Sequence, residues 1–186
     1  MRTVVYSMNP SVDGYVADPE GSLDWGVPDD EVFAFHLAQI REIGVHLLGR
    51  RLYEAMLYWE TAEQDPELDA ANREWARLWK ALPKVVFSRT LTRVEGSNTR
   101  LATASPAEEI ERLRAEPEDG HIAIGGPDLA AHAEDLIDEY RAVVQPVLLG
   151  GGLPYFPQHG RRVRLELLET RTIRSQSVYY RYRVVR

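Results

Sequence analysis

Short apolar runs rich in Val, Ile and Leu alternate along this chain with longer segments whose apolar positions recur every three to four residues. The short runs have the length and β-branched content of buried strands. They predict strands at residues 3–8, 45–49, 83–88, 121–124 and 142–149. The longer segments have the periodicity of amphipathic helices. They predict helices at residues 29–43, 50–57, 66–82, 106–115 and 126–133.

Two of these predicted helices begin with recognisable capping signals. Asp65 precedes Pro66, which places an N-cap residue before a proline at the first helical position. Ser105 and Glu108 have the spacing of a capping box, again with proline at the first helical position. The segments 164–170 and 177–185 alternate apolar and polar residues, which indicates an antiparallel strand pair at the end of the chain.

The alternation of strands and helices defines the expected fold class. It is typical of α/β proteins, in which helices cover both faces of a mostly parallel sheet. The terminal strand pair would add an antiparallel part. Because no repeat, low-complexity tract or linker interrupts residues 1–186, we expect a single domain.

Composition and charge narrow the classes of function. The hydrophobic content of 44% and the charged content of 27% are those of an ordinary folded globular protein. The net charge of −7 argues against a nucleic acid or an anionic membrane as partner. The chain has no cysteine, which excludes disulfides, thiolate metal sites and a cysteine nucleophile, and its five histidines lack metal-ligand spacing. With no signal-peptide pattern, we expect a cytoplasmic protein without a metal.

The segment 122–129 indicates a ligand site. A short apolar run stops at Gly125 and Gly126, and a helical pattern begins directly afterwards. Glycines let a ligand approach the backbone closely, and the free N–H groups of a helix start favour a phosphate. A simple turn is the alternative interpretation.

Three more loops follow predicted strands. They are residues 9–17, 49–51 and 88–90. Ligands of parallel α/β sheets bind beyond the carboxyl ends of the strands. We therefore expect these loops and the glycine pair to converge on one cleft.

Five motifs occur in a familiar order: SVDGYVA (11–17), GRRLYE (49–54), KVVFSRTL (84–91), IGGPDLA (124–130) and PVLLGGGLPYF (146–156). Together they resemble the dihydrofolate reductase-like family, most closely the reductase domain of the bifunctional riboflavin-biosynthesis protein in a stand-alone form. The deaminase half of that protein has no counterpart here, because the chain carries no Cys/His zinc signature.

The resemblance implies NADPH as cofactor, with Arg50 and Arg51 at its 2′-phosphate. An arginine fork suits a phosphate, although a solvent-exposed arginine at a helix start is the alternative for Arg50, and a polar turn for Arg89. The family usually has threonine where this chain has Leu52, so phosphate binding would depend more on backbone N–H groups. The implied cofactor-binding residues are Val16, Ala17, Gly49, Arg50, Arg51, Ser88, Arg89, Gly125, Gly126, Pro127 and Leu129.

Substrate recognition is less well defined by the sequence. The resemblance places Asp13 and Gly14 beside the nicotinamide and substrate, but an Asp-Gly turn explains them equally well. Trp25 and Tyr53 are candidates for stacking on a flat ring, or for the core. The acidic residues 29–31 stand where dihydrofolate reductases have a carboxylate, yet acidic residues are favoured at any helix start. We assign no catalytic residue.

The resemblance predicts a reductase of a small heterocycle, similar to 5-amino-6-(5-phosphoribosylamino)uracil reductase. A dihydrofolate reductase and a non-catalytic module that binds a nucleotide or other small ligand are the alternatives. The family also implies a homodimer with a small-molecule substrate, and the apolar alternation of the C-terminal strands would provide a surface for pairing.

Overall fold

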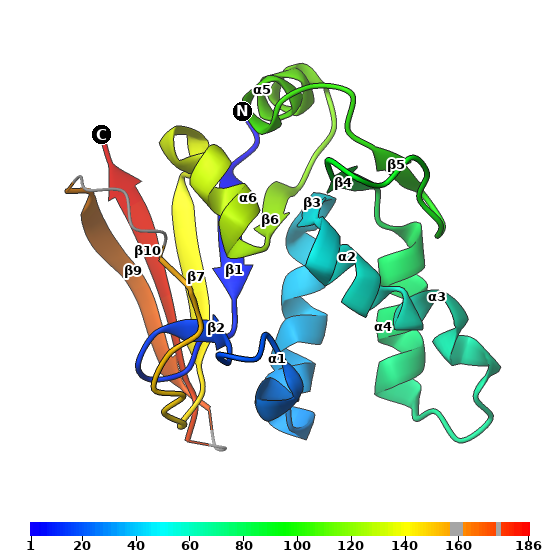
Figure 1. Cartoon of the computed structure of the whole chain (residues 1–186), viewed down its shortest axis with the longest axis vertical. Helices are drawn as coiled ribbons and strands as arrows, with labels where there is room; N and C mark the ends of the chain where they lie inside the picture. The colour runs from blue at the N-terminus through cyan, green and yellow to red at the C-terminus, as the bar shows by residue number, and fades with distance from the viewer. Residues whose placement is uncertain (157–161, 174–175) are drawn as a thin grey trace.

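The computed structural model describes residues 1–156, 162–173 and 176–186. Its main sheet has eight strands in the order β5-β4-β3-β6-β1-β7-β10-β9 (Figure 1). In chain order these are β1 (Val4–Met8), β3 (Ile43–Gly49), β4 (Lys84–Phe87), β5 (Thr99–Leu101), β6 (His121–Gly125), β7 (Glu139–Val144), β9 (Arg164–Thr172) and β10 (Val178–Val185). A separate antiparallel pair joins β2 (Tyr15–Ala17) to β8 (Leu153–Pro154). The helices are α1 (Asp30–Gln39), α2 (Arg50–Met56), α3 (Tyr58–Thr61), α4 (Ala70–Ala81), α5 (Pro106–Ala115) and α6 (Pro127–His132).

Strand pairing confirms the mostly parallel sheet. The strands from β5 to β7 in the sheet order all pair in parallel, and only β10 and β9 at the far edge are antiparallel. Parallel strands end at the same edge of a sheet, so the loops after β1, β3, β4 and β6 emerge side by side.

Helices cover both faces of this sheet. Because successive side chains of a strand point to opposite faces, the core is divided between the two faces. On β3, Val45 and Leu47 belong to the cluster that includes Ile110 of α5 and Leu129 of α6. Leu48 points the other way, into a second cluster with side chains from α2 and α4. This alternation is what a strand buried on both faces requires.

The end of α4 is held by a buried lysine at the start of β4. Lys84 Nζ donates hydrogen bonds to the carbonyl oxygens of Trp79 (2.6 Å) and Leu82 (2.9 Å). These carbonyls end the helix without a partner of their own, so a cation there satisfies them and complements the helix dipole. Burial lowers the pKa of Lys84, an effect that the neighbouring Glu60 partly offsets. The contact fixes α4 against the sheet.

The structure corrects several predicted boundaries. The helix predicted at 29–43 ends at Gln39, and β3 begins at Ile43. The helix predicted from Pro66 begins only at Ala70, because Asp69 is the N-cap and accepts a hydrogen bond from Asn72 N at 2.8 Å. Asp65 instead accepts from Glu67 N at 2.9 Å, within the preceding turn. The strand predicted at 142–149 is β7, which lies earlier, at Glu139–Val144.

The shift of β7 has a physical reason. Its first residues include Glu139 and Arg141, which reasoning from hydropathy excludes from a buried strand, and both are buried through pairing with each other. Pro146, which follows β7, has no backbone N–H and cannot donate the hydrogen bond that a central strand requires. The short strands β2, β5 and β8 and the helix α3 were not predicted, since segments of two to four residues carry little periodicity.

Gly152, just before β8, lies against the backbone at the end of β2. Its φ is +123°, and a Cβ there would overlap the carbonyl oxygen of Ala17 and lie 2.8 Å from the carbonyl carbon of Asp18. We expect Gly152→Ala to lower the free energy of unfolding by more than about 1 kcal/mol, because both strain and a backbone clash arise. Urea unfolding measures the change. Gly26→Ala is the control, since no heavy atom lies within 4 Å of its Cβ position; equal losses in both variants would contradict the prediction.

Candidate functional site

A cavity of about 450 Å³ lies on the sheet face that α1, α2 and α4 cover. This volume is within the range of small-molecule sites. The main sheet contributes Val5, Ser7, Met8, Ile43, His46, Ala123 and Arg141 to its lining. The rest comes from the loop after β2 (Leu23 to Pro28), from α1 (His36 and Gln39), from α2 (Leu52, Ala55 and Met56), and from Trp75 and Trp79 of α4, together with Asn9, Val16 and Ile40.

The cavity exists because the sheet presents small side chains at its centre. Val5 of β1 and Ala123 of β6 lie on adjacent strands in register. Their neighbours Val4, Tyr6, Ile122 and Ile124, which point to the opposite face, fill the core with larger groups. Large indole rings from α4 and from the loop after β2 also line the cavity.

Two histidines of the cavity lining are held neutral. Burial lowers the pKa of both His36 and His46 to about 4, since charging an imidazole away from water is unfavourable. His36 Nε2 lies 3.0 Å from the side-chain nitrogen of Asn9. The ring of His46 packs edge-on against Trp79 at 5.6 Å between centroids. At neutral pH neither group is a proton donor of ordinary imidazolium strength.

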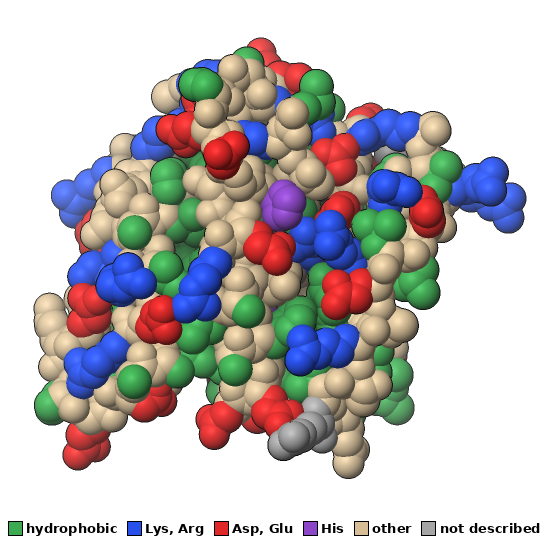
Figure 2. Space-filling view, turned by 180° about the vertical axis from the view of Figure 1, so that it is seen from behind, with side chains coloured by type: hydrophobic (Ala, Val, Ile, Leu, Met, Phe, Trp, Pro, Cys, Tyr) green, Lys and Arg blue, Asp and Glu red, His purple; other side chains and the backbone are tan. Residues whose placement is uncertain are grey.

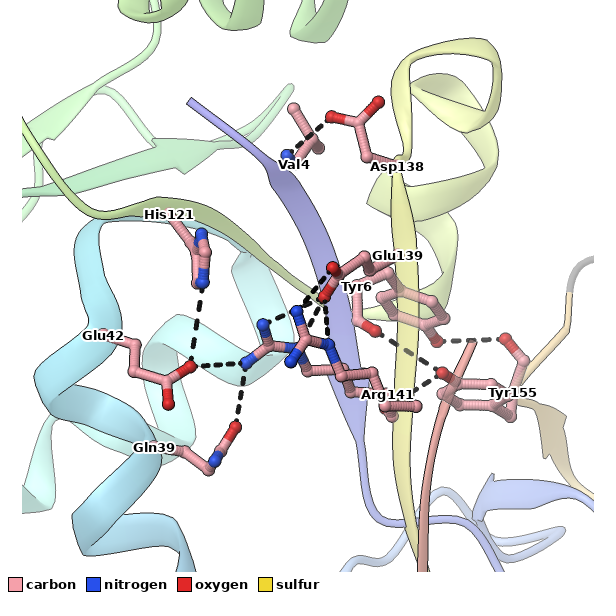
Figure 3. Close-up of polar contacts among 10 residues, drawn as sticks. Val4, Tyr6, Gln39, Glu42, His121, Asp138, Glu139, Arg141 and Tyr155 are labelled. Atoms are coloured by element: carbon pink, nitrogen blue, oxygen red, sulfur yellow. Dashed lines mark hydrogen bonds and ion pairs between the residues drawn. The ribbon is translucent and has the colours of Figure 1, made fainter. Parts of the chain in front are cut away.

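Arg141, which lines the cavity, is the centre of a network of ion pairs and hydrogen bonds (Figure 3). Arg141 donates from Nη2 and Nε to Glu139 at 2.9 and 3.1 Å, and from Nη1 to Gln39 and Glu42 at 2.9 Å each. Arg181 of β10 donates to the same Glu139 at 2.7 and 2.8 Å. Burial alone would raise the pKa of Glu139, but the hydrogen bonds from the two arginines outweigh it and lower that pKa.

The predicted phosphate-binding elements meet at the carboxyl edge of the sheet. Gly49 ends β3 beside Gly125 and Gly126, which end β6: a Cβ on Gly49 would lie 3.7 Å from the Gly125 carbonyl oxygen, and one on Gly126 4.0 Å from Gly49 N. Gly126 has a φ of +104°, which favours glycine. Pro127 and Leu129 are buried in the short α6 that follows. This backbone surface without side chains suits a pyrophosphate.

Arg50 extends across the ends of β3 and β4. Its Nε donates to Glu54 at 2.7 Å and its Nη1 to the Thr90 hydroxyl at 2.7 Å. Ser88 Oγ accepts from the backbone N–H groups of Thr90 and Leu91. Arg51 and Arg89 are exposed. These residues and the glycines form a group that fits a dinucleotide, with cations at one end and bare backbone at the other.

Leu52 connects this edge to the cavity. It lines the cavity, and its terminal methyl group together with His46 Cε1 occupies the space where a Gly125 side chain would lie. The Leu52 side chain therefore packs against Gly125. Val16 lines the cavity too, whereas Ala17 is buried in β2.

The four predicted substrate residues do not lie together. Trp25 lines the cavity. Asp13 accepts hydrogen bonds from Ser11 Oγ (2.6 Å), Leu149 N (3.1 Å) and Gly150 N (2.7 Å), which tie two loops together and lower its pKa. Gly14 closes the turn by donating to the Ser11 carbonyl. Tyr53, a residue of α2, is buried in the cluster with Trp79, and its hydroxyl accepts from Glu95 N at 2.7 Å.

Sequence reasoning did not single out His36, His46, Gln39 or Arg141 for the site. A histidine or glutamine inside a helical stripe gives no signal of its own, and only the pairing of strands brings these residues to one space. Asp29 is the N-cap of α1, accepting from Glu31 N (3.0 Å) and Val32 N (2.9 Å).

The described residues contain neither a helix suited to crossing a membrane nor a group of three or more metal-ligating side chains. On the face drawn in Figure 2, acidic and basic side chains are interspersed, and no large area carries one sign.

Comparison with known structures identifies the architecture as dihydrofolate reductase-like. A dihydrofolate reductase from Enterococcus faecalis, solved as a complex with NADP(H) and RAB-propyl, is 18% identical and superposes with a TM-score of 0.61, covering 99% of this chain and 97% of that one. A putative riboflavin biosynthesis protein from Shewanella sp. PV-4 is 24% identical with a TM-score of 0.76, and each chain is covered to 99%.

Comparison of the sequence with known protein families identifies the family of this chain. The RibD C-terminal domain matches residues 2–179, and the chain belongs to this family, which is one of reductase domains. An uncharacterized protein, YyaP of Bacillus subtilis (strain 168), is 28% identical over 185 residues, which span 96% of this chain and 95% of that protein.

The Glu139 network predicts how stability depends on pH. A carboxyl group whose pKa is lower in the folded state contributes stability above its unfolded pKa, 4.5 for glutamate, and loses it as the pH falls through the folded value. Glu139→Gln leaves Arg141 buried with fewer partners, so we expect a loss of about 3 kcal/mol at pH 7. The difference from the wild type should shrink below pH 4.

Urea unfolding at pH 7 and at pH 3.5 measures this difference. Glu166→Gln is the matched control, because Glu166 pairs with Arg183 at the surface, where an ion pair contributes about 0–1 kcal/mol. A loss for Glu139→Gln that stays constant across this pH range would show that the carboxylate charge is not what stabilises the fold.

Proposed function

We propose that the protein is a cytoplasmic, single-domain, NADPH-dependent reductase of a small ring compound. The observation that carries this proposal is the position of Leu52 and His46, which line the cavity and also contact the position of Gly125. A dinucleotide laid over the glycine pair would therefore bring its nicotinamide end to the cavity, and a substrate inside the cavity would lie beside it. Hydride transfer depends chiefly on such alignment.

In this proposal the protein's own groups bind and orient. Arg50, with Arg51 and Arg89 nearby, would hold the 2′-phosphate, and the backbone at Gly49, Gly125 and Gly126 would hold the pyrophosphate. The bound cofactor would supply the hydride. The apolar walls of the cavity would exclude water from the reacting carbon.

Two other functions are distinguished by simple assays. Leu52 removes the hydroxyl that family members use at the helix start, which favours a non-catalytic binding module; tight NADPH binding without oxidation by any acceptor would support that function. A dihydrofolate reductase would turn over dihydrofolate and be inhibited by methotrexate.

Arg50 provides the test of the cofactor site. In calorimetric titrations we expect NADPH to bind more tightly than NADH, which lacks the 2′-phosphate. Arg50→Ala should weaken NADPH binding by about 1.5–3 kcal/mol, the contribution of hydrogen bonds to a charged group, and leave NADH binding nearly unchanged. Arg77→Ala is the control for the loss of one positive charge, because Arg77 is an exposed residue of α4. Unchanged NADPH affinity in Arg50→Ala would refute the assignment.

We further propose a homodimer formed through β9. All nine residues of this edge strand are exposed, among them Leu165, Leu167 and Leu168. Among the described residues, β9 pairs only with β10, so its outer edge can accept a second copy. Sedimentation velocity should show a dimer for the wild type and a monomer for Leu167→Lys, with Val12→Lys, an exposed residue elsewhere, still dimeric. A monomeric wild type at working concentration would refute the proposal.

A further inference from the structure

Three buried polar atoms around the cavity have no hydrogen-bond partner within the described part of the protein. They are Nε1 of Trp25, Nε1 of Trp75 and Nδ1 of His46, and all three residues line the same cavity. An indole N–H can only donate, and a buried donor without an acceptor is costly. Each atom exposes less than 1 Å² of surface to solvent, so a ligand in the cavity reaches it only when the ring turns toward that space. An acceptor atom offered there would then remove the cost.

The same cavity offers no free positive charge among its described lining residues. Arg141 is its one Arg or Lys, and Figure 3 shows the guanidinium surrounded by Glu139, Glu42 and Gln39. Asp24 adds a carboxylate to the lining. Moving a phosphate from water into such a space is unfavourable, because no cation is available to pair with it.

The shape of the cavity favours a flat ring. Three indole rings, those of Trp25, Trp75 and Trp79, line it, and the small side chains of Ala123 and Val5 lie on the sheet side. Aromatic faces pack well against planar conjugated systems. Hydrogen bonds from the indole N–H groups to oxygen atoms of the ligand would fix the orientation of such a ring.

We propose that this cavity binds an uncharged, flat ring compound whose carbonyl oxygens accept hydrogen bonds from Trp25 and Trp75, and that it rejects ligands carrying a phosphate. The proposal rests on the reductase function for its chemistry. The ring compound would accept a hydride with its electron pair at a carbon conjugated to the carbonyl group. The resulting enolate oxygen would take a proton from water, and the nicotinamide would be left oxidised.

The test uses three probes on the same sample, first saturated with NADP⁺ so that hydride transfer cannot occur. 1,4-Naphthoquinone is flat, uncharged and has two carbonyl oxygens; 1,4-naphthoquinone-2-sulfonate adds one negative charge to the same ring; 5-amino-6-(5-phosphoribosylamino)uracil carries a phosphate. The absence of cysteine removes thiol addition to the quinone as a complication. Calorimetry should show binding of the neutral quinone and at least tenfold weaker binding of both charged compounds.

Single substitutions locate the bound ring. Trp25→Phe keeps an aromatic side chain and removes the N–H, so the quinone should bind about three- to tenfold more weakly, the value of one hydrogen bond. Trp25 lies in a one-turn 3₁₀ helix, so the variant is expected to fold. Trp59→Phe is the matched control, because Trp59 does not line the cavity. Its quinone affinity should equal that of the wild type.

The outcomes separate the two proposals. If NADP⁺ and NADPH do not bind, the reductase function is refuted, whatever the quinone does. If the nucleotide binds but the phosphoribosyl compound or the sulfonate binds as tightly as the neutral quinone, only the present inference is overturned. The inference is also overturned if the quinone fails to bind the nucleotide-loaded protein, or if Trp25→Phe and Trp59→Phe affect its affinity equally.

Discussion

Arg141 of β7 and Arg181 of β10 are direct partners across an antiparallel strand pair, where two like charges repel. Glu139, two residues before Arg141 on the same face of β7, accepts hydrogen bonds from both guanidinium groups. The carboxylate therefore makes this pairing of strands favourable. This contact lies at the junction between the parallel part of the sheet, which includes β1 and β7, and the antiparallel part, which is formed by β10 and β9. The register of the sheet at this junction depends on the three charged residues.

The cavity depends on the same junction. Arg141 faces α1. Its remaining hydrogen bonds go to Gln39, the last residue of α1, and to Glu42 just beyond it, so the helix is held over the sheet at a fixed position. The carboxylates of Glu42 and Glu139 neutralise the charge of Arg141. A residue that looks like an anion-binding group in the sequence is thus part of the wall, and the space it borders is electrically neutral and largely apolar. Buried ion pairs contribute more to such specificity of arrangement than to net stability.

The glycine pair and the cavity serve different parts of the proposed reaction, and one side chain joins them. Leu52 lies in the first turn of α2, packs against Gly125 and lines the cavity. The apolar side chain of Leu52 agrees with the apolar lining of the neighbouring space.

The sequence by itself determined the local elements, the parallel sheet and the chain positions of the glycine pair and Arg50, because hydrophobic period, caps and glycines act over a few residues. It also determined the family, through five motifs in order, which residues 2–179 confirm. Only the tertiary structure decided that Ala123, His46 and Trp75 border one space, since these residues come from β6, β3 and α4. It also decided that Tyr53 is buried in the core and that Asp13 ties two loops together. The burial of Glu139 and Arg141 could not be read from hydropathy, because each residue is tolerated in the interior only by the presence of the other.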